Sequence, residues 1–277
     1  MLSAIGVSTT LVPMSTSGDE GASPEGAPVG LKGLFIDAII ERLEEGGIDV
    51  AVHSAKDLPA EENGELLIAA VPRRADPSDV LVLRNGSLPP GGAIGTSSQR
   101  RKAQLLRSFP GVQVRDLRGN LDTRLGLLDE GKVDAIVVAS AGLARLGIVR
   151  EHSRELSTEQ MVPAPGQGAL AVQARADDEE TLGVLAELDH AESHLALDAE
   201  RSLMRRLGGG CALPLGAIAR VAVGAVKLVA VVCTPDGERV ARAEVTSDSA
   251  EGAGAAAAKE LLARGAEEIL ASVTNPA

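Results

Sequence analysis

The stretch Ile48-Asp49-Val50-Ala51-Val52-His53-Ser54-Ala55-Lys56-Asp57-Leu58-Pro59 decides the fold class of this 277-residue chain. Its first five residues form a short, largely apolar run of the kind that makes a buried strand. Polar side chains follow directly at the carboxyl end of the run, where open α/β sheets bind their ligands. The stretch therefore predicts an α/β fold with a ligand-binding edge.

Short apolar runs alternate with amphipathic helical patterns on both sides of this stretch. Because strands alternate with helices, we expect sheets whose strands are joined by right-handed crossovers. The predicted strands cover residues 48–52, 66–71, 80–83, 133–138 and 169–172, and the predicted helices cover residues 33–45, 98–108, 121–130 and 178–188.

After Glu192 the pattern becomes that of a smaller α+β domain. The turn Pro235-Asp236-Gly237 is a hairpin signal, so we expect an antiparallel sheet. The predicted elements are a helix at 193–207, strands at 215–223, 227–233 and 239–245, and an Ala-rich helix at 250–270.

Two segments of the chain resemble each other. Residues 43–49 and 128–134 each lead from a helical pattern through a glycine into a valine-rich strand. The likeness indicates either a structural repeat between two similar lobes or an ordinary helix cap followed by a strand. The sequence alone leaves both interpretations open.

Composition and charge exclude several classes of function. The net charge is −12 and the aromatic residues are Phe35 and Phe109 alone, which argues against nucleic acids and anionic membranes as partners. No apolar run is long enough to cross a bilayer, and the N-terminus lacks the pattern of a signal peptide, so we expect a cytoplasmic protein. An acidic ligand would need a local cluster of positive charge, and Arg, which outnumbers Lys, binds carboxylates through paired hydrogen bonds.

Two further junctions between a strand and a helix carry arginines. At the first, residues 95–101, a helix N-terminus could bind an anion, whereas capping by Ser97 or Ser98 followed by two solvated arginines is the ordinary interpretation. At the second, Arg118 and Arg124 either face one cleft or lie on the surface. Three polar clusters at such junctions in an acidic chain favour a common binding site.

Two single residues in the first stretch can likewise have either a chemical or a purely structural role. Asp57 is a candidate for chemistry, but an Asp before Leu-Pro is commonly a turn former. His53 is either a base or a satisfied histidine at the end of a strand. Their spacing alone does not decide between these interpretations.

The two cysteines lie in contrasting contexts. Cys211 follows Gly208-Gly209-Gly210, a flexible turn on which a thiol can be a nucleophile or an attachment point. Cys233 lies in an apolar run and is expected to be buried and inert. Neither fits a metal-ligand spacing or a disulfide framework. Gly166-Gln167-Gly168 lacks the third glycine of a dinucleotide fingerprint, so nucleotide use is not supported.

Taken together, these segments resemble the porphobilinogen deaminase (hydroxymethylbilane synthase) family. The match is collinear from about Pro13 to the C-terminus. The segments that carry it are Lys32-Gly33-Leu34-Phe35, Val52 to Pro59, Gly95 to Arg101, Asp116-Leu117-Arg118-Gly119-Asn120, Pro163-Ala164-Pro165-Gly166-Gln167-Gly168-Ala169 and Gly209-Gly210-Cys211.

The resemblance implies three domains and an activity. Two lobes similar to periplasmic solute-binding proteins would comprise residues 1–74 with 168–188 and residues 75–167, and a C-terminal α+β domain would comprise residues 189–277. The enzyme would be a transferase of porphyrin and heme biosynthesis that condenses four porphobilinogen molecules into hydroxymethylbilane and releases ammonia. It would act as a monomer on porphobilinogen and the growing pyrrole chain.

The resemblance also implies roles for individual residues. Cys211 would hold a dipyrromethane cofactor through a thioether, and Asp57 would be the catalytic residue beneath the pyrrole nitrogens. No metal is implied. The remaining cofactor-binding residues would be Lys56, Thr96, Ser97, Ser98, Arg100, Arg101, Arg118 and Arg124, and the substrate-binding residues would be Arg145, Lys32, Phe35 and Gln167.

One departure from the family pattern keeps two alternatives open. Relatives begin with a strand and a helix that carries an Arg-x-Ser motif, whereas this sequence starts at Met1-Leu2-Ser3. We therefore expect the first strand of lobe 1 to be missing, which leaves the folding and activity of this chain open. The alternatives are an N-terminally truncated, inactive relative and a two-lobed small-molecule binding protein.

Overall fold

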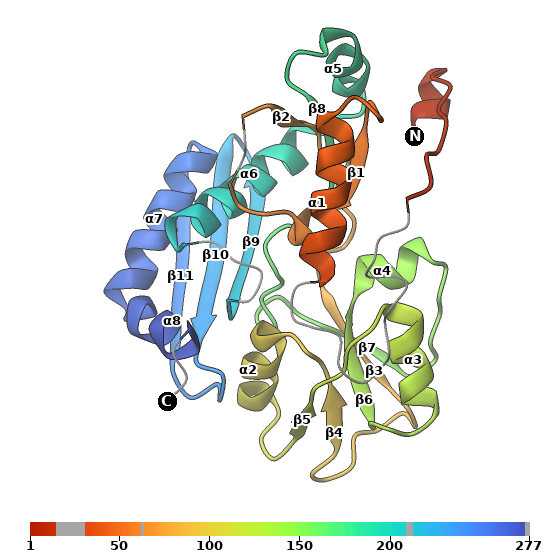
Figure 1. Ribbon diagram of the computed structural model, residues 1–277. Coiled ribbons are helices and arrows are strands. Elements are labelled where there is room, and N and C mark those ends of the chain that lie inside the picture. The colour runs from red at the N-terminus through yellow and green to blue at the C-terminus, as the bar shows by residue number, and fades with distance from the viewer. Residues whose placement is uncertain (15–30, 62–63, 209–212, 275–277) are drawn as a thin grey trace.

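The structure is a computed structural model that describes residues 1–14, 31–61, 64–208 and 213–274, without the side chains of residues 31–35 and 274 (Figure 1). Within these ranges the chain forms three separate sheets. Two belong to lobes of α/β structure and the third to an α+β domain at the C-terminus, which confirms the predicted fold class. No helix in the described ranges combines the length and the apolar character needed to cross a membrane.

Lobe 1 consists of η1 (Leu2–Ile5), α1 (Leu31–Glu44), β1 (Ala51–Ser54), η2 (Ala55–Asp57), β2 (Leu66–Ala70), β8 (Leu170–Arg175) and α5 (Glu179–Ala186). Its sheet has the order β1-β8-β2, and both neighbouring pairs are antiparallel. Side chains of β8 alternate between the two faces, so that Ala171 packs with Ile36 of α1 and Val172 packs with Leu185 of α5. Each face of the sheet is therefore covered by one helix.

Lobe 2 consists of β3 (Asp79–Leu83), β4 (Ala93–Gly95), α2 (Gln99–Ser108), β5 (Gln113–Arg115), α3 (Leu121–Asp129), β6 (Ala135–Ala139), α4 (Ser140–Arg145) and β7 (Ser153–Leu156). Its sheet has the order β5-β4-β6-β3-β7. β4 is parallel to β5 and β6, whereas β3 is antiparallel to β6 and β7. The expectation of parallel crossovers is thus wrong for part of the sheet, because the strand that brings the chain into lobe 2 runs against its neighbours.

The C-terminal domain consists of α6 (Ala191–Arg206), β9 (Leu215–Ala222), β10 (Ala225–Cys233), β11 (Val240–Ser247), α7 (Ala250–Ala263) and α8 (Ala266–Thr274). The three strands form the predicted antiparallel sheet, and the helices pack on one of its faces (Figure 1). The prediction of a single helix over residues 250–270 is wrong. Gly265 has φ +85°, a conformation that costs little at glycine, and it separates α7 from α8.

The two similar segments noted in the sequence end their helices in the same way. Gly46 and Gly131 both have positive φ, at 73° and 77°. In each case the next residue donates its N–H five residues back, from Gly47 to Arg42 and from Lys132 to Leu127. This is the Schellman cap, so the likeness is explained by the ordinary helix ending.

The chain crosses between the lobes twice. Residues 71–78 lead from β2 to β3, and residues 157–169 lead from β7 to β8. We call them the first and second crossing segments. Any change in the relative position of the lobes has to bend these two segments.

One buried carboxylate joins both crossing segments to the C-terminal domain. Glu200 of α6 is 0% exposed. Its Oε1 accepts hydrogen bonds from Arg74 Nη1 (2.6 Å) and Ala219 N (2.7 Å), and its Oε2 accepts them from Gly166 N (2.6 Å) and Arg74 Nη2 (3.1 Å). Arg74 and Gly166 belong to the first and second crossing segments and Ala219 to β9. Glu200 therefore anchors the C-terminal domain where the lobes meet.

Replacing this carboxylate is expected to destabilise the protein. Glu200→Gln should lower the free energy of unfolding by about 3 kcal/mol or more, because Arg74 would become a buried charge without its partner. The measurement is a urea denaturation curve followed by circular dichroism.

A matched control lies in the same domain. The Glu251 side chain is 62% exposed and pairs with Arg205 and Arg206. Glu251→Gln should therefore change the free energy of unfolding by less than about 1 kcal/mol. Equal losses in the two variants would show that Glu200 is no anchor.

Candidate functional site

The site forms where the second crossing segment presses against η2. A Cβ atom at Gly166 would lie 2.8 Å from the backbone C of Ala55 and 2.8 Å from the backbone N of Lys56. A Cβ atom at Gly168 would lie 2.5 Å from the backbone O of Ala75. Both glycines also have positive φ. The motif around Gln167 therefore needs glycine because backbone meets backbone here.

η2 presents Asp57 toward lobe 2. Asp57 and Lys56 are half-buried at the end of β1. Burial lowers the pKa of Arg124, and the positive charge of Arg101 lowers it further, whereas the carboxylates of Asp116 and Asp57 oppose both effects. An acidic group of lobe 1 thus acts on a basic group of α3. Asp57 and Arg101 therefore both lie within electrostatic reach of Arg124.

The loop before α2 is a helix cap. The Ser98 side chain accepts a hydrogen bond from Arg101 N (3.4 Å), and Thr96 Oγ1 accepts one from Ser98 N (3.2 Å). Thr96 is buried, whereas Ser97 is exposed. The capping interpretation is confirmed for Ser98.

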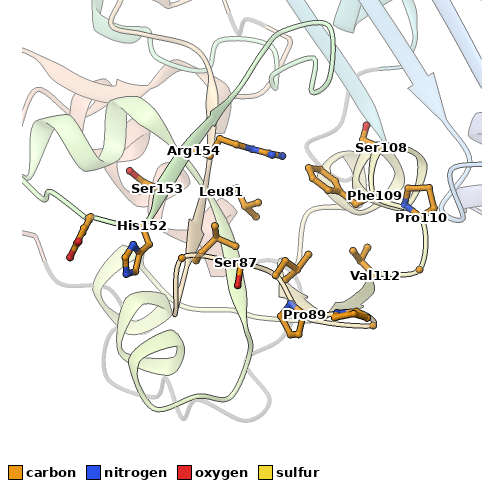
Figure 2. A pocket seen from close by; sticks show the side chains of 17 residues that line it. Leu81, Ser87, Pro89, Ser108, Phe109, Pro110, Val112, His152, Ser153 and Arg154 are labelled. Carbon is orange, nitrogen blue, oxygen red and sulfur yellow. The ribbon is translucent and has the colours of Figure 1, made fainter.

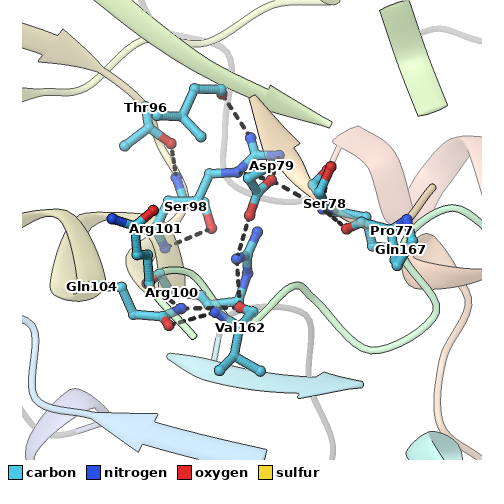
Figure 3. A network of polar contacts seen from close by, with 12 residues as sticks. Pro77, Ser78, Asp79, Thr96, Ser98, Arg100, Arg101, Gln104, Val162 and Gln167 are labelled. Atoms are coloured by element: carbon cyan, nitrogen blue, oxygen red, sulfur yellow. Dashed lines mark hydrogen bonds and ion pairs between the residues drawn. The ribbon is translucent and has the colours of Figure 1, made fainter. Parts of the chain in front are cut away.

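The expectation that solvated arginines follow this cap is wrong. Arg100 is 4% exposed and Arg101 is 6% exposed. Both bind Asp79, the first residue of β3, which is 0% exposed (Figure 3). The carboxylate lies 21 and 22 residues away in sequence, so the spacing of the loop gave no sign of it.

The geometry around Asp79 uses both carboxylate oxygens. Arg101 donates to Oδ1 from Nε (3.0 Å) and Nη2 (2.7 Å), and Arg100 Nη1 donates to Oδ2 (2.7 Å). Gln167 Nε2 donates to Oδ1 as well (3.0 Å). Burial on its own would raise the pKa of Asp79, but the two guanidinium groups outweigh it and hold the pKa far below its usual range.

The other two arginines come from the turn before α3 and from α3 itself. Asn120 caps this helix by accepting a hydrogen bond from Thr123 N (2.9 Å). Arg118 is exposed and its Nε donates to Asp116 (3.1 Å), and Arg124 Nε donates to Gly119 O (2.8 Å). These bonds fix the stems of both arginines beside the start of α3.

The remaining predicted residues lie at the crossing segments or outside the described part of the structure. Arg145 Nη2 donates to Gly168 O (2.8 Å), which places it at the second crossing segment. Gln167 is buried, and its Nε2 also donates to Pro77 O (2.7 Å). Lys32 and Phe35 lie in the first turns of α1, but their side chains are not described. Cys211, between α6 and β9, lies outside the described residues.

His53 and Cys233 are both buried. His53 packs inside lobe 1, where burial lowers its pKa, and its Nε2 has no hydrogen-bond partner among the described residues, so the interpretation as a satisfied histidine is not met. Cys233 is buried in the C-terminal domain, and burial raises the pKa of its thiol to about 11. Neither residue belongs to the site.

Within the described residues, the donor set of the site suits a ligand with carboxylates and N–H groups. Buried polar atoms without a hydrogen-bond partner in this part of the chain include Arg100 Nε and Gln167 Oε1, which belong to the Asp79 network. The first can donate to a carboxylate and the second can accept from an N–H group. A group such as dipyrromethane, which carries both, fits these residues.

One hollow among the described residues lies away from these side chains. It has a volume of about 850 Å³ and lies on lobe 2 beside β7 (Figure 2). Leu81 and Val112 line it, and the Arg154 guanidinium lies 5.3 Å from the centre of the Phe109 ring. None of the predicted site residues lines it.

Sequence reasoning missed three residues that organise the site: Arg74, Asp79 and Glu200. Asp79 directly precedes an apolar run, and Glu200 lies inside a helical pattern, so both resemble ordinary surface acids in sequence. Their burial is the unusual property. No local pattern reveals it, because each partner lies at least 21 residues away except Ala219 at 19.

Several known structures are similar in part. One is the second substrate-binding domain of a putative amino acid ABC transporter from Streptococcus pneumoniae, with a TM-score of 0.36, 14% identity and coverage of 55% of this chain and 69% of that one. Another is a periplasmic binding protein of an arginine transport system from Legionella pneumophila, with a TM-score of 0.33, 13% identity and coverage of 55% and 70%.

The similarity to curated proteins is much stronger. Porphobilinogen deaminase of Brevibacillus brevis is 44% identical over 263 residues, which is 93% of this chain and 85% of that protein. The Thermus thermophilus protein of the same name is 45% identical and covers 94% and 87%. The one from Mycobacterium avium is 44% identical and covers 99% and 91%.

Family models match the chain in two parts. The model described as "Porphobilinogen deaminase, dipyromethane cofactor binding domain" matches residues 1–183, and the model of the porphobilinogen deaminase C-terminal domain matches residues 194–263. The first alone covers more than half of the chain. With the relatives above, these matches show that the chain belongs to the porphobilinogen deaminase family.

Proposed function

We propose that this chain is a hydroxymethylbilane synthase, a transferase that condenses four porphobilinogen molecules into the linear tetrapyrrole hydroxymethylbilane and releases ammonia in porphyrin and heme biosynthesis. The observation that carries the proposal is that Asp57 of lobe 1 lies within electrostatic reach of Arg124 of lobe 2, which Arg101 also reaches. The family membership supports it.

Asp57 is the catalytic residue of this proposal. Its carboxylate accepts hydrogen bonds from pyrrole N–H groups and stabilises the positive charge that develops on the nitrogen during condensation. Two unit charges 4 Å apart attract each other by about 4 kcal/mol at an effective dielectric constant of 20. Only the part of this energy that is absent from the neutral ground state accelerates the reaction.

Positive side chains overcome the repulsion between an acidic protein and an acidic substrate. The chain carries a net charge of −12, and each porphobilinogen unit carries an acetate and a propionate. Guanidinium groups bind such carboxylates through two parallel hydrogen bonds. The residues assigned to carboxylate binding are Arg100, Arg101, Arg118 and Arg124, with Lys56, Thr96, Ser97 and Ser98 assisting, and the residues assigned to the incoming substrate are Arg145, Lys32, Phe35 and Gln167.

Cys211 attaches the dipyrromethane cofactor through a thioether. When bound, this group supplies the terminal pyrrole to which the substrate units are added. Cys211 lies between α6 and β9, and α6 also carries Glu200. The anchor at Glu200 therefore holds the helix that leads to the attachment residue against both crossing segments.

The predicted division of the chain belongs to the same proposal. Residues 1–74 with 168–188, residues 75–167 and residues 189–277 each contain one of the three sheets, which supports these boundaries. We further infer a cytoplasmic enzyme that acts as a monomer, without nucleic acid or membrane partners. Because the proposal uses Cys211 for a thioether and not for a disulfide, it favours a reducing compartment.

Covalent attachment at Cys211 is the direct test of the proposal. Protein purified from a host that makes porphobilinogen should exceed its sequence mass by one dipyrromethane, measured by intact-mass spectrometry. Cys211→Ser should lose the adduct, because the thioether requires the sulfur, whereas the control Cys233→Ser should keep it. A folded wild-type protein with two unmodified thiols would contradict the proposal and favour a two-lobed binding protein.

Asp57→Asn should separate attachment from turnover. The adduct should still form, while kcat should fall by about 1000-fold, the equivalent of the charge interaction above. Steady-state formation of hydroxymethylbilane measures the rate. Asp122→Asn, an exposed acid in the first turn of α3, is the matched control and should keep the wild-type rate. Near-normal turnover of Asp57→Asn would remove this residue from the mechanism.

The Cys233 thiol should be unreactive in the folded protein. With a pKa of about 11, only about one molecule in a thousand carries the thiolate at pH 8. In the Cys211→Ser variant, Cys233 is the one cysteine left in the sequence. Iodoacetamide should therefore label Cys233 only after the protein is unfolded in urea, as followed by mass spectrometry. Any slow labelling of Cys233 in the folded protein should become faster as the pH rises toward the pKa of its thiol. Rapid labelling of folded protein at pH 8 would disprove the burial.

A further inference from the structure

We propose that Asp79 is a positioning residue for carboxylate recognition, which holds Arg100 and Arg101 in place for the cofactor and substrate and links them to the second crossing segment through Gln167. The inference rests on the proposed function and deepens it. Asp79 lies among buried groups and touches the arginines, so its role is exerted through them (Figure 3).

The charges of the network favour an anion. Two buried guanidinium groups contact one buried carboxylate, Asp79, so that one positive charge has no carboxylate of its own in this contact. Asp76, whose charge also reaches Asp79, accepts hydrogen bonds from Ser78. An uncompensated charge inside a protein is costly unless a partner neutralises it. A carboxylate of the bound ligand is the partner that the proposed function supplies.

Arg100 and Arg101 differ in how many of their guanidinium nitrogens donate hydrogen bonds within the protein. All three guanidinium nitrogens of Arg101 are held in place, because Nε and Nη2 bind Asp79 and Nη1 donates to Val137 O (2.9 Å), and each Nη keeps a second N–H. Arg100 uses Nη1 alone, for Asp79 and for Val162 O (2.8 Å). Its buried Nε has no partner among the described residues. Asp79 therefore fixes one arm of Arg100 while another donor remains available to a ligand.

The Asp79 carboxylate is also connected to both segments that join the lobes. Asp79 begins β3 directly after the first crossing segment, and Gln167 belongs to the second. Gln167 Nε2 also donates to Pro77 O (2.7 Å) and Ser78 O (3.3 Å), which ties the two crossing segments together beside Asp79. A movement of the lobes that bends these segments must shift Asp79, and with it the arginines.

The test compares Asp79→Asn with the wild type as full-length apoprotein, produced in a host that makes no porphobilinogen. On addition of porphobilinogen, cofactor attachment followed by intact mass should be about tenfold slower in the variant, because the arginines lose their common partner. In the completed enzyme KM for porphobilinogen should rise more than kcat falls. Wild-type protein without any adduct would instead overturn the proposed function itself.

Thermal stability supplies a readout independent of turnover. The apoprotein midpoint should fall by about 10 °C in Asp79→Asn, since two buried guanidinium groups lose their counter-charge. Attachment of the cofactor should raise the midpoint less in Asp79→Asn than in the wild type, because arginines that have lost their common partner bind the ligand carboxylates less tightly. A purely structural role predicts the same gain from the cofactor in both proteins.

Two further variants keep the proposal falsifiable. Asp134 of lobe 2 accepts a hydrogen bond from Ala93 N (2.9 Å) and pairs with Arg84, so Asp134→Asn controls for the loss of a structural carboxylate and should attach the cofactor at the wild-type rate. Asp79→Glu keeps the charge but displaces it, and should give an intermediate rate even if Asp79→Asn fails to fold. Wild-type attachment and KM in Asp79→Glu, or in a folded Asp79→Asn, would overturn the inference.

Discussion

The ion pair between Asp79 and the two arginines at the start of α2 is the interaction on which the site depends. A fully buried carboxylate is tolerated only when opposite charges and hydrogen bonds satisfy it, and here Arg100, Arg101 and Gln167 together do so. Because Asp79 begins β3 and Gln167 lies in the second crossing segment, the pair forms where the lobes meet. The position of the basic groups is therefore a property of the fold and not of flexible surface side chains.

Local groups of arginines offset the repulsion between this acidic protein and an acidic ligand. The protein's net charge of −12 opposes any polycarboxylate, yet lobe 2 carries guanidinium groups on α2, on the turn before α3 and on α3 itself. The charges of Arg101, Asp57 and Asp116 all influence the pKa of Arg124, so these groups lie within electrostatic reach of one guanidinium. Asp57 is thus an acid in a basic environment, suited to pyrrole nitrogens while its neighbours bind carboxylates.

Much of the fold could be predicted, because periodicity and turn chemistry act locally. The strand predicted over 48–52 is found at Ala51–Ser54, since pairing with β8 extends it to Ser54, and the cap at Ser98 follows its sequence signal. What acts over long distances could not be predicted. The break at Gly265 is invisible in an Ala-rich pattern, and the burial of Arg100 depends on Asp79 from another strand. The close approach at Gly166 likewise appears only in three dimensions.

The account requires that the pyrrole nitrogens of the bound cofactor meet Asp57 while its carboxylates meet the arginines. A crystal structure of the protein purified with its adduct measures both at once. The account predicts a pyrrole nitrogen within hydrogen-bond distance of the Asp57 carboxylate, and a cofactor carboxylate on Arg100 or Arg124. A cofactor attached to Cys211 but lying outside the interlobe region, with the Asp57 side chain directed away from it, would contradict the account.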